Sequence, residues 1–149
     1  MDKKFNYEEF IKSFNVIGVV EDKILFEKDI HDAIKFAKNT YSFDMLKNIT
    51  AIDKQEQGIE IIYHLYSTEN NENVRFSITL QDECESVTDI FKSAQADENE
   101  IYDMFGIKFL GNESLKRLYM PESWQGFPLK KDYVQDDTRL AWNDSSKDV

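Results

Sequence analysis

Apolar and polar residues alternate with a period of two in two neighbouring stretches in the middle of the chain. A polar run at 69–73 separates the stretches. Such alternation is typical of antiparallel strands that lie with one face on a core. The sequence therefore predicts two long antiparallel strands joined by a turn. Their apolar faces are Ile59, Ile61, Tyr63 and Leu65 in the first, and Val74, Phe76, Ile78 and Leu80 in the second.

Apolar residues at helical spacing occur both before and after these two strands in the sequence. Apolar residues recur at helical intervals over 30–41, and Asp29 is the expected N-cap. A shorter helix is predicted over 7–14, and another from Ser86 or Thr88 towards Phe105. The remaining apolar runs predict further strands, at 16–20, 24–26 and 49–52.

The pattern changes after Gly106, because no period of 2 or 3.6 continues there. We interpret residues 111–134 as an extended, irregular arm and residues 135–149 as a polar tail. The predicted fold class is α+β: residues 1–110 form a domain with a mainly antiparallel sheet and helices packed on one face. Residues 111–149 then form a partner-binding arm and tail.

Charge and cysteine content remove several classes of function. The net charge is −11 over 149 residues, which argues against a nucleic-acid partner. Cys84 is the one cysteine, so neither an internal disulfide nor a cysteine-rich iron–sulfur or zinc site fits. The longest apolar run has five residues, at 16–20, whereas a membrane span needs about 20. No direct membrane insertion is expected.

An extended arm is costly to order, at roughly 1–2 kcal/mol per residue for the backbone alone. It must dock on its own domain, dock on another protein, or remain mobile. Residues 82–103 hold eight acids and one lysine, whereas 116–131 hold four basic residues and one acid. The two stretches either pair within the chain or each face a partner.

The residues that could act in catalysis or metal binding have a simpler structural interpretation. Glu98, Glu100 and Asp103 could form a hard-metal site or an acid–base pair, but partners for arginine or lysine are the favoured role. His31 and His64 lack a second catalytic residue at motif spacing. Acidic neighbours make Cys84 a poor nucleophile. With no glycine-rich phosphate loop, we expect no catalytic residue, metal or cofactor in this chain.

Three runs in the second half carry a family resemblance: ENEIYDMFGIKFLG at 98–111, LKRLYMPE at 115–122 and WQGFPLKKDY at 124–133. They resemble E-R-E-x-x-D-M-F-G-I-x-F-x-G, L-R-R-L-x-x-P-x and W-x-G-x-P-L-R-K-D-Y. These are signatures of the thirty-kilodalton subunit of NADH-quinone oxidoreductase (complex I) and its relatives in membrane-bound energy-converting hydrogenases. Residues 46–53 and 61–65 are also similar to the family, so the resemblance covers about 43–134.

Several positions depart from the family pattern. Asn99 replaces arginine, Ala96 replaces tryptophan, and residues 112–113 replace His-Pro. Lys116 and Lys130 stand where arginine is usual, and lysine lacks the bidentate fork of arginine. These changes point away from a standard respiratory enzyme and leave room for the alternative, an equivalent subunit in a membrane-bound [NiFe] hydrogenase or a ferredoxin-linked complex.

The resemblance implies a cofactor-free structural subunit at the cytoplasmic face of the membrane. Such a subunit packs on the large hydrogenase-like subunit, near the small iron–sulfur subunit, and its neighbours transfer the electrons. Iron–sulfur clusters, and a nickel–iron site or quinone, would then belong to those partners.

The expected partner interface combines acidic residues of the third helix with the arm. It consists of Glu98, Glu100, Asp103, Lys116, Arg117, Pro121, Trp124, Pro128, Lys130, Lys131, Asp132 and Tyr133. Two other hypotheses remain open. One is a stand-alone small enzyme that uses the carboxylate group, and the other is an acidic module that binds a basic partner through 82–103.

Overall fold

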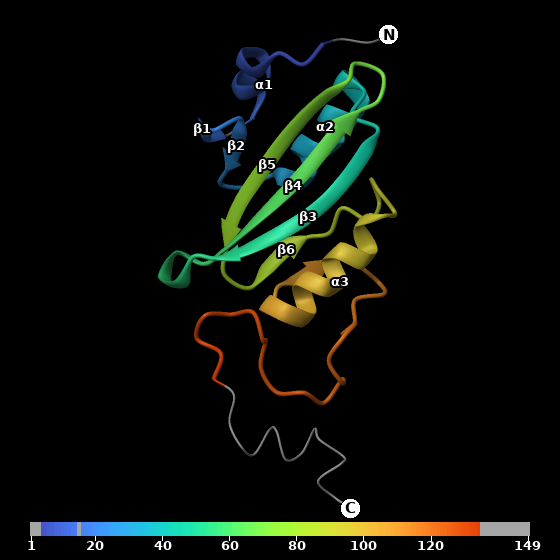
Figure 1. Ribbon diagram of the computed structural model, residues 1–149. Coiled ribbons are helices and arrows are strands. Elements are labelled where there is room, and N and C mark those ends of the chain that lie inside the picture. The colour runs from blue at the N-terminus through green and yellow to red at the C-terminus, as the bar shows by residue number, and fades with distance from the viewer. Residues whose placement is uncertain (1–3, 15, 135–149) are drawn as a thin grey trace, which may run out of the picture.

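The computed structural model describes residues 4–14 and 16–134 of the chain. A five-stranded sheet has the order β1-β2-β5-β4-β3 (Figure 1). All neighbouring strands are antiparallel except β2 and β5, which are parallel. The predicted α+β class with a mainly antiparallel sheet is therefore confirmed. The strands are β1 (Val16–Val20), β2 (Lys23–Phe26), β3 (Met45–Asp53), β4 (Ile59–Ser67) and β5 (Glu72–Leu80).

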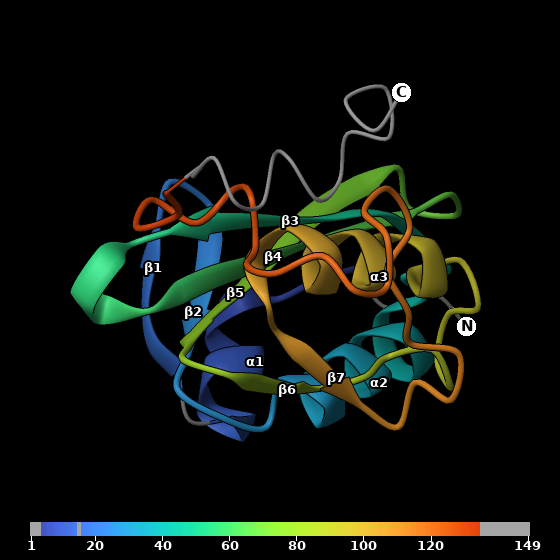
Figure 2. The ribbon, with the colours of Figure 1, turned by 90° about the horizontal axis from the view of Figure 1, so that it is seen from below.

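Helices α1 (Tyr7–Ser13) and α2 (Ile30–Tyr41) lie against one face of this sheet (Figure 2). The apolar face predicted for β4 and β5 forms that side, and all of its members are buried apart from the half-buried Leu80. Phe10 of α1 stacks on Phe76 of β5, with ring centroids 5.1 Å apart. The alternating pattern therefore identified the core face correctly.

The third helix begins later than its sequence predicts. Helix α3 comprises Ala94–Phe105, whereas a start at Ser86 or Thr88 was expected. The carboxylate of Glu98 accepts bonds from the Val87 amide and the Ser86 hydroxyl, and residues 87–93 form turns instead. Helix α3 lies along the edge of β3, where the Asp97 carboxylate accepts the Ile49 amide at 3.0 Å.

Short elements also differ from the sequence expectations. Strand β3 extends over 45–53 rather than 49–52, with an irregularity between Leu46 and Asn48. A parallel pair, β6 (Glu83–Glu85) and β7 (Lys108–Leu110), was not predicted. A 3₁₀ turn, η1 (Gln55–Gln57), connects β3 to β4. Asp29 is the N-cap residue of α2, as predicted, but its φ is 62° and its side chain makes no capping hydrogen bond.

The arm, residues 111–134, follows β7 and passes below α3 in Figure 1, where it is drawn orange to red. Within the described residues it forms turns and extended segments without regular secondary structure. The polar tail predicted for 135–149 lies outside the described residues. None of the described helices has both the length and the apolar character of a membrane-spanning helix.

Candidate functional site

Asp103 of α3 holds the start of the arm against the domain. Its side chain is fully buried, and Oδ2 accepts the backbone amides of Leu118, Tyr119 and Met120 at 3.2, 2.7 and 3.1 Å. Three successive amides converge on one carboxylate oxygen, so a tight bend of the arm wraps around a single charge. Charge-assisted bonds of this kind are stronger than neutral ones.

Arg117 completes this contact from the arm. Its Nη1 donates to Asp103 Oδ1 at 3.0 Å, and its Nη2 donates to the carbonyl of Gly126 at 2.9 Å. The guanidinium lies over the ring of Phe127, 4.9 Å from the centroid. The side chain of Arg117 is only 6% exposed. It therefore connects α3 to two parts of the arm from inside the molecule. The sequence left open whether the acidic and basic stretches pair within the chain, and this ion pair does so.

The C-terminal end of α3 is shaped to receive Phe127. Gly106 ends the helix with φ of 79°, a conformation that favours glycine. A Cβ at this position would lie 2.7 Å from the Phe127 ring. The Leu129 amide also donates to the carbonyl of Met104 at 3.0 Å. The glycine thus lets the second half of the arm pack directly on the helix end.

Glu98 forms a second buried acceptor on α3. Its carboxylate accepts the Val87 amide at 2.8 Å, the Ser86 hydroxyl at 2.7 Å and the Asn112 side-chain amide at 3.0 Å. Burial raises the pKa of Glu98 above its usual range, although these hydrogen bonds act to lower it. Glu98 connects α3 to the segments before it and after β7, and it is fully buried within its own chain.

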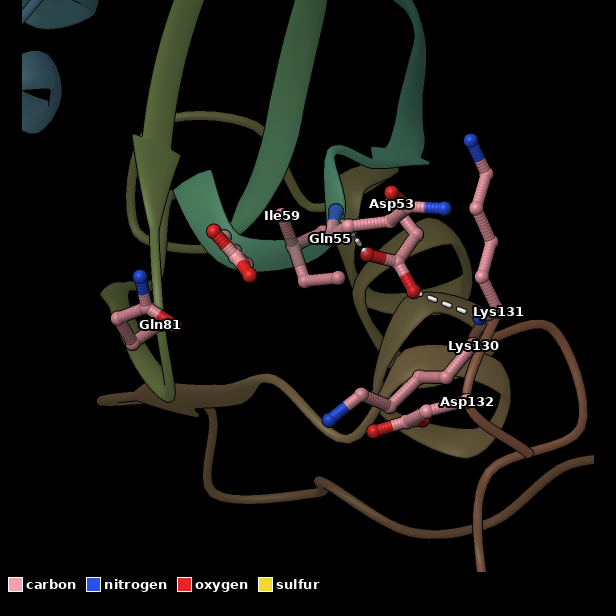
Figure 3. A pocket seen from close by; sticks show the side chains of 9 residues that line it. Asp53, Gln55, Ile59, Gln81, Lys130, Lys131 and Asp132 are labelled. Carbon is pink, nitrogen blue, oxygen red and sulfur yellow. Dashed lines mark hydrogen bonds between the residues drawn. The ribbon is translucent and has the colours of Figure 1, made fainter.

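The far end of the arm docks beside the β3–β4 connection. Asp53 Oδ2 accepts the Lys131 amide at 2.7 Å, while Oδ1 accepts the Gln55 amide at 2.7 Å (Figure 3). The bond from Lys131 is the main cause that lowers the pKa of Asp53. These contacts border a pocket of about 440 Å³ whose lining includes Gln81, Lys130 and Asp132.

The arm exposes several large apolar side chains among its polar ones. The exposed large apolar side chains of the arm are Leu118, Tyr119, Leu129 and Val134, and Leu110 lies just before it. Tyr119 is 68% exposed and Leu129 is 57% exposed. Trp124 is half-buried, and its Nε1 has no hydrogen-bond acceptor among the described residues. The backbone of the arm is thus bound inward while apolar side chains face solvent.

The structure divides the expected interface residues into two groups. Glu98, Asp103 and Arg117 are used inside the chain. The others remain at least partly accessible: Glu100, Lys116, Pro121, Trp124, Pro128, Lys130, Lys131, Asp132 and Tyr133. Sequence reasoning missed the roles of Asp53, Asn112 and Phe127, and it also missed the exposed apolar residues. No periodic pattern marks any of these positions.

Cys84 and His31, the other residues considered for catalysis, make contacts within the chain that fit structural roles. Burial raises the pKa of the Cys84 thiol to about 11, and the thiol lies 3.3 Å from the hydroxyl of Tyr63. His31 Nε2 contacts the Asp89 carboxylate at 2.9 Å. Across residues 4–14 and 16–134, no group of three or more histidine, cysteine or acidic side chains is placed to hold a metal ion.

Comparison with known proteins gives a consistent set of relatives. Residues 25–139 match the model of the family described as "Respiratory-chain NADH dehydrogenase, 30 Kd subunit". The C/D subunit of NADH-quinone oxidoreductase from Phocaeicola vulgatus is 35% identical over 108 residues, which cover 70% of this chain and 21% of that protein. The C subunit from Geobacter sulfurreducens is 33% identical over 108 residues, or 68% of this chain and 67% of the relative.

A second form of the C subunit, from Rhizobium etli, is 40% identical over 95 residues, which cover 61% of this chain and 51% of that protein. The chain therefore spans about a fifth of the C/D relative. It spans between half and two thirds of the Geobacter and Rhizobium relatives. The matched family region includes the strand that carries Asp53, all of α3, and the arm.

Proposed function

Because the chain belongs to the family of the 30-kDa subunit of respiratory-chain NADH dehydrogenase, we propose that it is a structural subunit of an NADH-quinone oxidoreductase-type complex. In this role the arm binds a neighbouring subunit and the chain itself holds no cofactor. The neighbours are the large hydrogenase-like subunit and the small iron–sulfur subunit, at the cytoplasmic face of the membrane. Iron–sulfur clusters in these partners carry the electrons.

The observation that carries this proposal is the two-sided character of the arm. Buried Asp103 and Arg117 fix its backbone from within, while Leu118, Tyr119 and Leu129 are exposed on the outside. Exposed apolar groups that cluster on one segment are typical of protein–protein contact sites. Hydrogen bonds within the chain already hold parts of the arm's backbone, so a partner has less of it to order on binding.

Trp124, Lys130 and Asp132 fit the same role. The indole N–H of Trp124 is buried and lacks an acceptor among the described residues, so a turn of this half-buried side chain would be needed for a partner's acceptor to reach it. Lys130 and Asp132 line the open pocket beside the arm, where they are available to side chains of opposite charge. Such charged contacts at the rim select orientation more than they add affinity.

The experiment that tests the proposal compares outward-facing substitutions in the tagged full chain, purified from its native cells in mild detergent. Leu129→Asp and Tyr119→Asp should reduce recovery of partner subunits at least tenfold, as measured by mass spectrometry. Ile17→Asp is the matched control, because Ile17 is 66% exposed but lies on β1, away from the arm. Full recovery with both arm variants, or equal loss with Ile17→Asp, would overturn the proposed interface.

The equivalent subunit of a membrane-bound [NiFe] hydrogenase or ferredoxin-linked complex is the second candidate. Lys116 and Lys130 stand where arginine is usual, and this departure from the family pattern leaves room for it. The proteins that co-purify distinguish the two, since only one complex brings NADH-oxidising subunits. If the purified chain alone showed turnover that Glu100→Gln abolished, both structural interpretations would give way to an enzyme.

A further inference from the structure

Three basic side chains meet on the face of the sheet opposite α1 and α2. His64 on β4 pairs in register with Asn48 on β3 and with Arg75 on β5, and Lys47 lies at the irregularity just before Asn48. Lys47, His64 and Arg75 line one pocket of about 370 Å³. Three adjacent strands thus bring three potential cations to a single concave site.

None of these three side chains forms an ion pair with a carboxylate of the described residues. Within residues 4–14 and 16–134, the guanidinium of Arg75 donates a hydrogen bond to the carbonyl of Glu21. The ammonium of Lys47 lies over the ring of Tyr66, 5.4 Å from its centroid. In a chain with 29 acidic and 18 basic residues, a cluster of basic groups without acidic partners runs against the overall composition.

The electrostatic effect of the cluster is concentrated on His64. This side chain is half-buried, and burial is the main cause that lowers its pKa, followed by the nearby charges of Arg75 and Lys47. The site is therefore positive even when His64 is neutral. The net charge of −11 opposes anions at long range, but salt screens such effects beyond about 8 Å at physiological ionic strength.

We infer that the pocket formed by Lys47, His64 and Arg75 binds a small phosphate-class anion, as inorganic phosphate or a phosphate monoester. A monoester carries about 1.5–2 negative charges near pH 7 and presents three acceptor oxygens. Donors on three strands match three oxygens, whereas a carboxylate offers two oxygens and one charge. The guanidinium can bind two oxygens at once, and the ammonium acts as a point charge.

The negative charge of Asp22, in the β1–β2 turn, would repel an anion in this pocket. It lines the same pocket but, within the part of the chain that the structure describes, forms no ion pair with any of the three basic residues. Asp22 has φ of 65°, which asparagine tolerates at least as well as aspartate. Asp22→Asn therefore removes a repulsive charge with little effect on the backbone, and it should tighten phosphate binding about threefold.

The test is a titration of the full chain with inorganic phosphate at physiological ionic strength, where salt screens the net negative charge, with the His64 ring signals followed by NMR. Saturating phosphate should raise the pKa of His64 by about one unit, since opposite charges at close range shift a pKa by this order. Arg75→Gln and Lys47→Gln should each weaken binding about tenfold through loss of a charge-assisted bond. The two variants are independent, so the test survives if one of them fails to fold.

Lys92→Gln is the matched control, because it makes the same change in net charge at an exposed residue outside the pocket. Phosphate affinity should be unchanged in this variant, and acetate should bind at least tenfold more weakly than phosphate. Three outcomes would each overturn the inference: the absence of a saturable response at His64, equal weakening by Lys92→Gln and Arg75→Gln, or acetate binding as tight as that of phosphate.

Discussion

Asp103→Asn is the most informative single substitution, because it keeps the shape of the side chain and removes its charge. In the native protein Oδ1 accepts from Arg117 and Oδ2 accepts three backbone amides. Asparagine has one oxygen and one NH₂ group. In one orientation the NH₂ faces the guanidinium, and in the other it faces the amides of residues 118–120. Either way, donors oppose donors at a fully buried position.

The expected magnitude follows from this geometry. Removing one partner of a buried ion pair leaves the other charge uncompensated and costs about 3–5 kcal/mol. Asp103 and Arg117 are 0% and 6% exposed, so solvent compensates little of the loss. The first half of the arm should therefore detach in a local opening reaction. A change of about 3 kcal/mol corresponds to an opening constant more than about 100-fold larger.

Native-state hydrogen exchange measures this opening residue by residue. The amides of residues 118–120 should exchange at least about 100-fold faster in Asp103→Asn, or reach the rate of an unprotected amide. Amides of β4 and β5 should retain most of their protection. Glu100→Gln is the matched control, since it changes the same charge at an exposed position of the same helix. Equal protection of residues 118–120 in the two variants would refute the central role of Asp103.

Two further predictions concern the second half of the arm. Gly106→Ala should destabilise the protein by about 1–3 kcal/mol in thermal unfolding, because its Cβ would meet Phe127 and φ is 79°. Gly18→Ala, with open space around it, should have little effect, and a similar loss there would contradict the argument. Asp53 has a lowered pKa, so its contribution is complete above pH about 3.9 and is lost as pH falls through the lower folded-state pKa. The Lys131 amide resonance should move over that acidic range and should not move in Asp53→Asn; identical titrations would contradict the assignment.

The long, regular elements could be predicted from sequence because their core-facing residues follow a simple period. On β4 and β5 these residues recur at every second position, and the buried residues of α2 recur at helical spacing. Strands of three residues, such as β6 and β7, are too short to show a recognisable alternation of apolar and polar residues. The start of α3 was misplaced because the carboxylate of Glu98, 11 positions further along the chain, accepts the amide of Val87.

The contacts of the arm could be predicted only as a set of alternatives. The sequence showed an acidic stretch and a basic stretch, and it left open whether they pair within the chain. The structure forms one such pair, between Asp103 and Arg117, while the domain's other carboxylate contacts with the arm use mainly backbone amides. The side chain of Asn112, which donates to Glu98, is an exception. Every residue except proline has an amide, so side-chain patterns carry no signal for which amide is bound. Asp53 accordingly gave no sign of its role.

The use of backbone amides also explains how the arm can be ordered within the chain and still have side chains available to bind a partner. Carboxylates of the domain bind the arm mainly through amides of Leu118, Tyr119, Met120 and Lys131, while the side chains of these residues are left for other contacts. If burial of side chains ordered the arm instead, Leu118 and Tyr119 would be buried within the chain and could not contact a partner. Here the ordering comes from charge-assisted bonds to buried acids, and the exposed apolar area remains free to bind a partner. Loss of Asp103 should therefore weaken assembly with partner subunits, even though its side chain is inaccessible to them.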